Sequence, residues 1–272
     1  MNPTMATAKT PSPDAITKEE FDDLLSQYPA VVETISQSKG AKPGRKTLQE
    51  LDQYRYVDAL DMFGSDKSQR EMTLDHVKLL VEWKLRHGKF RPTLMSLVTS
   101  NPQPLTKSTI QAALHTYRTT ANIPSTLDAL TKLRGIGPAT ASLLLAVHDP
   151  TRVIFFSDEA FYWLCCGGGK APIKYTAKEY QSLRDRAGEL TKRLGVSATH
   201  VEKVAYVLME RPGAGAKSKA PAEEKAPKAV SKRGASSVKR KTVSSQDAAP
   251  RAPEDTAPKD VPGVRRSKRL KT

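Results

Sequence analysis

Apolar residues recur with helical spacing along much of this 272-residue chain. Between residues 74 and 85 they fall three or four positions apart, which places them on one face of a helix. That face consists of Leu74, Val77, Leu80, Val81 and Leu85. Gly88 and Pro92 follow, and these residue types commonly end a helix. No alternating pattern of useful length predicts a strand, and the one β-leaning run, residues 153–156, is too short to form a sheet.

Helix-start signals support the same interpretation. Thr17, Thr47 and Thr176 are each followed three positions later by Glu, which is the pattern of a capping box. Further N-cap candidates precede apolar-periodic stretches at Thr73, Ser125 and Ser197. We therefore predict one all-α domain over residues 17–210, preceded by a short disordered leader at residues 1–16.

The composition changes at residue 211. Residues 211–272 contain 17 Lys and Arg against 6 Asp and Glu, so this tail holds +11 of the net charge of +15 and leaves +4 for the rest. The tail has no aromatic and almost no branched apolar residue, so it cannot bury enough surface to offset the entropy of an ordered backbone. We expect it to be disordered.

Two dense basic clusters lie in the tail. Such clusters suit a nuclear import receptor or the backbone of a nucleic acid, and we expect a nuclear protein. The alternative is a solvated tail without a dedicated partner. The clusters consist of Lys239, Arg240 and Lys241, and of Arg265, Arg266, Lys268, Arg269 and Lys271.

The sequence excludes several other classes. The two cysteines, Cys165 and Cys166, are adjacent, which excludes a disulfide framework and a cysteine-held cluster within this chain. No histidine has a partner at metal-ligand spacing, so we predict no metal and no other cofactor. No apolar run approaches the roughly 18–20 residues of a membrane span, and the N-terminus lacks an apolar signal core. We expect a soluble monomer whose partner is a polyanion.

The most informative pattern lies in residues 127–149, which read LDALTKLRGIGPATASLLLAVHD. A short helix is predicted to end at Leu133, Gly135 and Gly137 provide the freedom that a tight turn needs, and Pro138 opens a second helix. The amides at the start of that helix are unpaired and carry partial positive charge, which favours a phosphate.

The residues around the turn add to this pattern. Lys132 and Arg134 place positive charge beside it, and Ile136 is predicted to point into the core. The stretch of about residues 125–148 resembles the helix-hairpin-helix, a motif that binds nucleic-acid backbones without reading their sequence. The resemblance implies binding of double-stranded DNA. The alternative is a helix pair with a glycine turn that serves only for packing or for a protein contact.

An aspartate follows the hairpin at a characteristic distance. Asp158 is the twenty-fourth residue when Gly135 is counted as the first, and it follows an apolar run at the predicted start of the next helix. This arrangement resembles the DNA glycosylase superfamily that is named for this hairpin and a Gly/Pro-rich loop. The resemblance is good over residues 127–164 and weaker around them. It implies a helical domain of the helix-hairpin-helix glycosylase type.

The resemblance also implies roles for individual residues. Asp158 would be the catalytic carboxylate, which stabilises the charge that develops on the sugar or orients water once the target base is flipped. Ala139 stands where bifunctional members have a lysine nucleophile, so the implied activity is monofunctional base excision without lyase chemistry. Ser157 or Asp158 could also simply cap the next helix. The phosphate contact would involve Gly135, Ile136, Gly137 and Thr140.

Aromatic residues offer candidates for a pocket that receives a flipped base. Burial in the core is the competing interpretation for each of them. The candidates are Trp83, Phe161, Tyr162 and Trp163. The sequence thus leaves three hypotheses: a nuclear DNA glycosylase, a non-catalytic module of the same fold that binds DNA or chromatin, and a helical protein-interaction domain.

Overall fold

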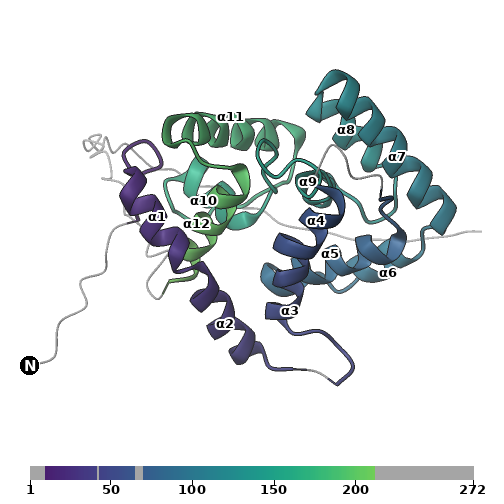
Figure 1. Cartoon of the computed structure of the whole chain (residues 1–272), viewed down its shortest axis with the longest axis horizontal. Helices are drawn as coiled ribbons and strands as arrows, with labels where there is room; N and C mark the ends of the chain where they lie inside the picture. Colours follow the sequence, from purple (N-terminus) through teal and green to yellow (C-terminus); the bar gives the residue numbers. More distant parts are fainter. Residues whose placement is uncertain (1–9, 42, 65–69, 212–272) are drawn as a thin grey trace, which may run out of the picture. The chain divides into compact units, whose positions relative to one another are not determined.

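The computed structural model describes residues 10–41, 43–64 and 70–211, which belong to one unit of the chain (Figure 1). Within these ranges every regular element is a helix, which confirms the all-α prediction. Apart from Arg211, the predicted tail with both of its basic clusters lies outside the described residues.

The helices follow one another along the chain, and Figure 1 labels the α-helices in order. The N-terminal elements are α1 (Lys18–Ser26), α2 (Tyr28–Lys39), α3 (Leu48–Gln53), the π-helix η1 (Tyr54–Asp58) and α4 (Ala59–Phe63). The central elements are α5 (Leu74–His87), α6 (Leu94–Thr99), α7 (Gln103–Thr120), α8 (Ile123–Leu130) and α9 (Pro138–Ala146). The C-terminal elements are α10 (Asp158–Cys166), α11 (Ala177–Leu194) and α12 (Ala198–Glu210).

Five of the six predicted N-cap residues stand at the start of a helix. All three predicted capping boxes are complete, at the N-termini of α1, α3 and α11. Thr73 and Ser197 are the N-cap residues of α5 and α12. The prediction for Ser125 is wrong, because Asn122 caps α8 and its Oδ1 accepts a hydrogen bond from the Ser125 amide at 2.9 Å.

The end of the N-terminal leader packs on α10 and α11. Ile16 is buried, and Trp163 donates from its indole nitrogen to the carbonyl of Pro11 at 2.9 Å. Arg193 donates to the carbonyl of Ile16 at 2.8 Å. The prediction of a disordered leader is therefore wrong for residues 10–16, since partners far along the chain hold a segment that has no helical pattern of its own.

The second helix of the predicted hairpin, α9, lies in the core. Every residue from 139 to 146 is buried, and both α5 and α8 pack against α9. The face of α5 predicted from apolar spacing is buried as a whole. A helix that is apolar on all sides is typical of a core position, so the start of α9 has a rigid support.

An extended, buried segment joins α9 to α10. Its Phe155 amide donates to Glu202 of α12 at 2.6 Å, and its Phe156 amide donates to the Ser142 hydroxyl of α9 at 2.9 Å. Glu202 also pairs with the fully buried Arg55 of η1 at 3.3 Å. These bonds fix the path of the chain from the hairpin helix to Asp158.

Candidate nucleic-acid interface

The turn between α8 and α9 depends on Gly135. Its φ of +77° lies in the left-handed region that side chains other than glycine disfavour. A Cβ at this position would lie 3.0 Å from the Val98 Cγ2 and from the Leu97 Cβ. The turn therefore presses against the end of α6, and only glycine fits there without a shift of the backbone.

Asn101 holds the turn in place from the side of α6. Its amide nitrogen donates to the carbonyl of Arg134 at 2.9 Å, and its Oδ1 accepts from the amide of Arg134 at 2.8 Å. The same amide nitrogen also donates to the carbonyl of Val98 at 2.9 Å. Asn101 is buried, so the turn is fixed before any ligand arrives.

The glycines leave hydrogen-bond donors at the start of α9. Gly137 is the N-cap and has no side chain to satisfy the first amides, and Pro138 follows at the first helical position as predicted. The amides of Gly135 and Gly137 donate to no acceptor among the described residues. Gly137 is exposed, so an incoming anion can reach this end of the helix.

Two of the predicted contact residues have other roles. Ile136 is buried, as predicted, and its amide donates to the carbonyl of Leu133 at 3.1 Å. Thr140 is buried as well, and its amide donates to the carbonyl of Gly137 at 2.9 Å. The prediction of a phosphate contact is therefore wrong for Thr140, and Ile136 serves the turn by packing.

Two basic side chains lie just before the glycines of the open turn. Lys132 and Arg134 are both exposed, and neither forms an ion pair with any residue that the structure describes. Because Asn101 fixes the Arg134 backbone on both sides, that guanidinium starts from a fixed point next to the glycines. The turn thus combines backbone donors with two uncompensated positive charges.

Asp158 is not the cap of its helix. Ser157 is the N-cap of α10, and its hydroxyl accepts from the amide of Ala160 at 3.0 Å. Asp158 instead accepts a hydrogen bond of 2.5 Å from the hydroxyl of Tyr175. Tyr175 has a φ of +56°, a strained value for an aromatic residue, and the Arg91 guanidinium lies 5.4 Å from its ring centroid. The sequence left open whether Asp158 caps α10. In the structure Ser157 is the cap, and the Asp158 carboxylate binds Tyr175 instead.

Titratable groups gather around Asp158. Burial raises the pKa of Glu159 to about 7, and the adjacent Asp158 adds to the effect. Burial lowers the pKa of the Lys84 ammonium, although the charge of Asp158 opposes the shift. Burial also raises the pKa of Tyr175, and its hydrogen bond to Asp158 acts in the same direction. Perturbed pKa values in one cleft are typical of functional sites and also of buried polar networks.

The space beside this cluster is small. A cavity of about 20 Å³ is bounded by Asp158, Glu159, Lys84 and Tyr175, together with residues at the end of α5. A volume of roughly 10–15 Å³ accommodates one water molecule. The cavity therefore has room for about one water and none for a nucleobase.

The aromatic pocket candidates do not line this cavity. Trp83 is fully buried and donates to Asp52 at 2.9 Å, and Trp163 is fully buried against the leader. Phe161 packs on the ring of Phe156, and Tyr162 is partly buried. The competing interpretation, burial in the core, is correct for both tryptophans and for Phe161. For Tyr162, which is partly exposed, the pocket role stays a prediction.

The sequence did not indicate the residues that fix the hairpin turn and that cover Asp158. Asn101 follows the end of α6 and lies 33 positions before Arg134, which it holds, and Tyr175 lies 17 positions after Asp158. Asn101 precedes a proline, which is a turn signal, but nothing in the local pattern indicates its partner. Tyr175 has no local signal at all, because its role depends on a left-handed backbone that tertiary packing imposes.

The comparisons with known proteins add no relative. No family model matches this chain, and no curated protein or solved structure matches it either. Among the described residues, no group of three or more His, Cys, Asp and Glu side chains could hold a metal ion. No helix in the described part of the chain has the length and apolar character to cross a membrane.

Proposed function

We propose that this protein binds the backbone of double-stranded DNA through the α8–α9 hairpin, without reading base sequence. The observation that carries the proposal is the open turn, in which the amides of Gly135 and Gly137 have no acceptor among the described residues. The exposed Lys132 and Arg134 come shortly before these glycines in the chain. A phosphate placed there would accept from the amides of Gly135 and Gly137 and neutralise both side chains.

The geometry of the hairpin favours phosphate binding more than it favours catalysis. Asn101 fixes the turn in advance, so little conformational freedom is lost when a phosphate binds. The basic tail would add sequence-independent affinity, and its two clusters would direct the protein to the nucleus through an import receptor. This is the non-catalytic member of the three hypotheses, a DNA- or chromatin-binding module.

Base excision is a second candidate, favoured by two observations. Asp158 is free of the capping role, and its neighbour Glu159 has a pKa near neutrality, as a general acid or base requires. The small volume of the cavity argues against it, because Tyr175 and Lys84 would have to move before a flipped base could approach Asp158. We therefore place DNA binding first.

Fluorescence anisotropy with the full-length chain and an undamaged duplex tests the binding proposal. The double variant Lys132→Ala/Arg134→Ala should lower the salt slope of log affinity by about two units, because each phosphate contact contributes close to one. The matched control is Lys178→Ala/Lys192→Ala, which removes two exposed charges from α11. If both double variants bind like the wild type, the hairpin is not the DNA site and the protein-interaction hypothesis gains.

A glycosylase assay tests the second candidate separately. The purified chain is incubated with duplexes that contain a panel of damaged or mismatched bases, and abasic sites are quantified. Abasic sites that disappear in Asp158→Asn would support base excision. Unchanged DNA affinity of Asp158→Asn, with no base released from any duplex, would leave the binding module as the function.

A further inference from the structure

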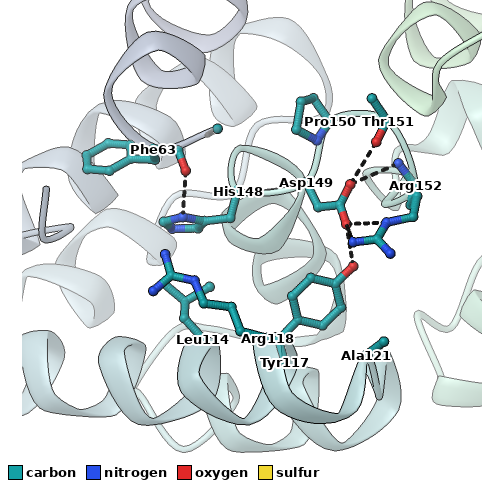
Figure 2. A pocket seen from close by; sticks show the side chains of 11 residues that line it. Phe63, Leu114, Tyr117, Arg118, Ala121, His148, Asp149, Pro150, Thr151 and Arg152 are labelled. Carbon is teal, nitrogen blue, oxygen red and sulfur yellow. Dashed lines mark hydrogen bonds and ion pairs between the residues drawn. The ribbon is translucent and has the colours of Figure 1, made fainter. Parts of the chain in front are cut away.

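A much larger cavity lies away from the hairpin, where α7 and α9 end (Figure 2). Its volume is about 600 Å³, within the range of roughly 300–1,000 Å³ that small-molecule sites occupy. The turn of the hairpin lies at the N-terminus of α9, whereas this cavity lies beyond its C-terminus. The two features are thus at opposite ends of one helix.

One wall of the cavity is fixed by Asp149. Its carboxylate accepts from the hydroxyl of Tyr117 at 2.6 Å, from the hydroxyl of Thr151 at 3.0 Å and from Nε of Arg152 at 2.7 Å (Figure 2). With these donors the carboxylate is saturated, and the guanidinium of Arg152 is held at the rim. Asp149 therefore has a structural role in the wall of the cavity and is not available to bind a ligand.

Arg118 supplies positive charge to the opposite wall. It is exposed in the last turn of α7, and it makes no hydrogen bond or ion pair with any residue in the described ranges. Together with Arg152 it outweighs the single charge of Asp149. The cavity is thus electropositive, and a planar guanidinium is well suited to phosphate oxygens.

His148 supplies an unused hydrogen-bond acceptor. Its Nδ1 lies 3.2 Å from the carbonyl of Phe63, which can only accept, so Nδ1 carries the proton and Nε2 presents a lone pair. Nε2 is buried and has no partner. Burial lowers the pKa of His148 to about 4, and the nearby charge of Arg118 contributes, so the ring is neutral at physiological pH.

The remaining lining is apolar and partly aromatic. The ring of Phe63 lies 5.5 Å from the imidazole of His148, centroid to centroid, and Leu114 borders the same space. A ligand that fits would combine an anionic group for the arginines, a flat apolar ring system for these walls, and an N–H donor for Nε2.

We propose that this cavity is a nucleotide-binding site, in which Arg118 binds the phosphate and His148 accepts a hydrogen bond from the base. Figure 2 draws the Arg118 guanidinium beside the imidazole, so its movement onto a phosphate would uncover Nε2 for the base. The nucleotide is either a free mononucleotide or the 5′-terminal nucleotide of a strand, since both present the same groups. The proposal does not depend on DNA binding by the hairpin.

Isothermal titration calorimetry of the full-length protein with adenosine 5′-monophosphate tests this site. Arg118→Ala should weaken binding roughly tenfold or more, because it removes the charged partner of the phosphate. Lys192→Ala is the matched control, since it removes one exposed charge from the last turn of α11, and binding should be unchanged. His148→Phe keeps a ring but no acceptor, and roughly fivefold weaker binding is expected.

Further titrations distinguish a free mononucleotide from the end of a strand, and they test whether the site is independent of the hairpin. If a dinucleotide with a 5′-phosphate binds more tightly than the same dinucleotide without it, the source is the end of a strand. If the two bind equally while the mononucleotide binds, the source is the free mononucleotide. Lys132→Ala/Arg134→Ala should leave binding of the mononucleotide unchanged. The proposal is overturned if the folded wild type does not bind the mononucleotide at millimolar concentration, or if Arg118→Ala binds as well as Lys192→Ala.

Discussion

The hairpin turn and the surroundings of Asp158 each lie at the start of a helix, and they differ in how accessible that helix start is to a ligand. Both α9 and α10 are nine-residue helices, but a buried stretch of chain precedes only α10. The N-cap of α9 is Gly137, which has no side chain, whereas the N-cap of α10 is Ser157, which satisfies the amide of Ala160. One helix start therefore keeps its donors for a ligand, and the other uses them internally.

The difference extends to the neighbouring side chains. Beside the hairpin, Lys132 and Arg134 face solvent, and Asn101 holds the backbone without covering the turn. Beside Asp158, Tyr175 and Lys84 fill the space and leave about 20 Å³. The start of α9 is thus accessible to a ligand, whereas side chains crowd the start of α10.

The largest loss of stability is expected from a change in the buried segment that joins α9 to α10. Glu202→Ala should destabilise the fold by about 3–5 kcal/mol, because it leaves Arg55 buried without its ion pair and the Phe155 amide without an acceptor. Urea unfolding measures this loss. Glu189→Ala, which breaks an exposed ion pair with Arg186, is the control and should cost less than about 1 kcal/mol. Equal losses of stability in the two variants would show that the buried contacts of Glu202 contribute no more to the fold than an exposed ion pair.

The pH dependence of stability distinguishes the closed region from the open one. The pKa of Glu159 rises from its ordinary value of 4.5 to about 7 in the folded chain. Its contribution to stability is therefore complete below about pH 4.5 and is lost as the pH rises toward 7. The loss amounts to about 3 kcal/mol relative to Glu159→Gln, which does not titrate. Unfolding free energies of both proteins between pH 4.5 and 7.5 test this, and parallel curves would contradict it.

Two glycines give opposite predictions. Gly135→Ala should destabilise the fold by about 1–3 kcal/mol, because the new Cβ meets Val98 at 3.0 Å in a left-handed backbone. Gly188→Ala, within α11, should stabilise it by up to about 1 kcal/mol, because a Cβ there meets no atom within 4 Å. Thermal melting compares the two variants. The same sign for both would mean that Gly135 is not under steric constraint.

The smallest effect concerns the hydrogen bond that closes the Asp158 region. Tyr175→Phe removes the bond to Asp158 and should cost about 1 kcal/mol, since the strained backbone and the aromatic packing remain. Tyr162→Phe, in the adjacent helix α10, removes a hydroxyl that bonds to no described residue and should be near neutral. If both melt like the wild type, Tyr175 closes the region by packing alone.

Local patterns predicted much of the fold. The capping boxes, the buried face of α5, and the turn with a left-handed Gly135 followed by Pro138 all appear as the sequence indicated. These features depend on residues within a few positions of one another, where backbone preferences and side-chain caps decide the outcome. The boundary error at Ser125 has the same origin, because two polar residues competed for one helix start.

The chemistry of the sites was less predictable. The sequence named Asp158 and the glycines, but it could not show that Tyr175 covers the aspartate, that Thr140 is buried, or that both tryptophans belong to the core. It gave no indication of the cavity between Tyr117 and His148. Each of these facts depends on contacts between residues that are distant along the chain.

From the sequence alone, an all-helical domain could be predicted, with a glycine hairpin and an aspartate at a fixed distance from it. Helix periods, caps and left-handed glycines are properties of short stretches, and short stretches are what a sequence displays directly. Tertiary packing was needed to show that the hairpin turn is accessible, that Tyr175 crowds the aspartate, and that a second cavity lies at the far end of α9. Openness and enclosure are properties of packing, and packing depends on which distant residues meet.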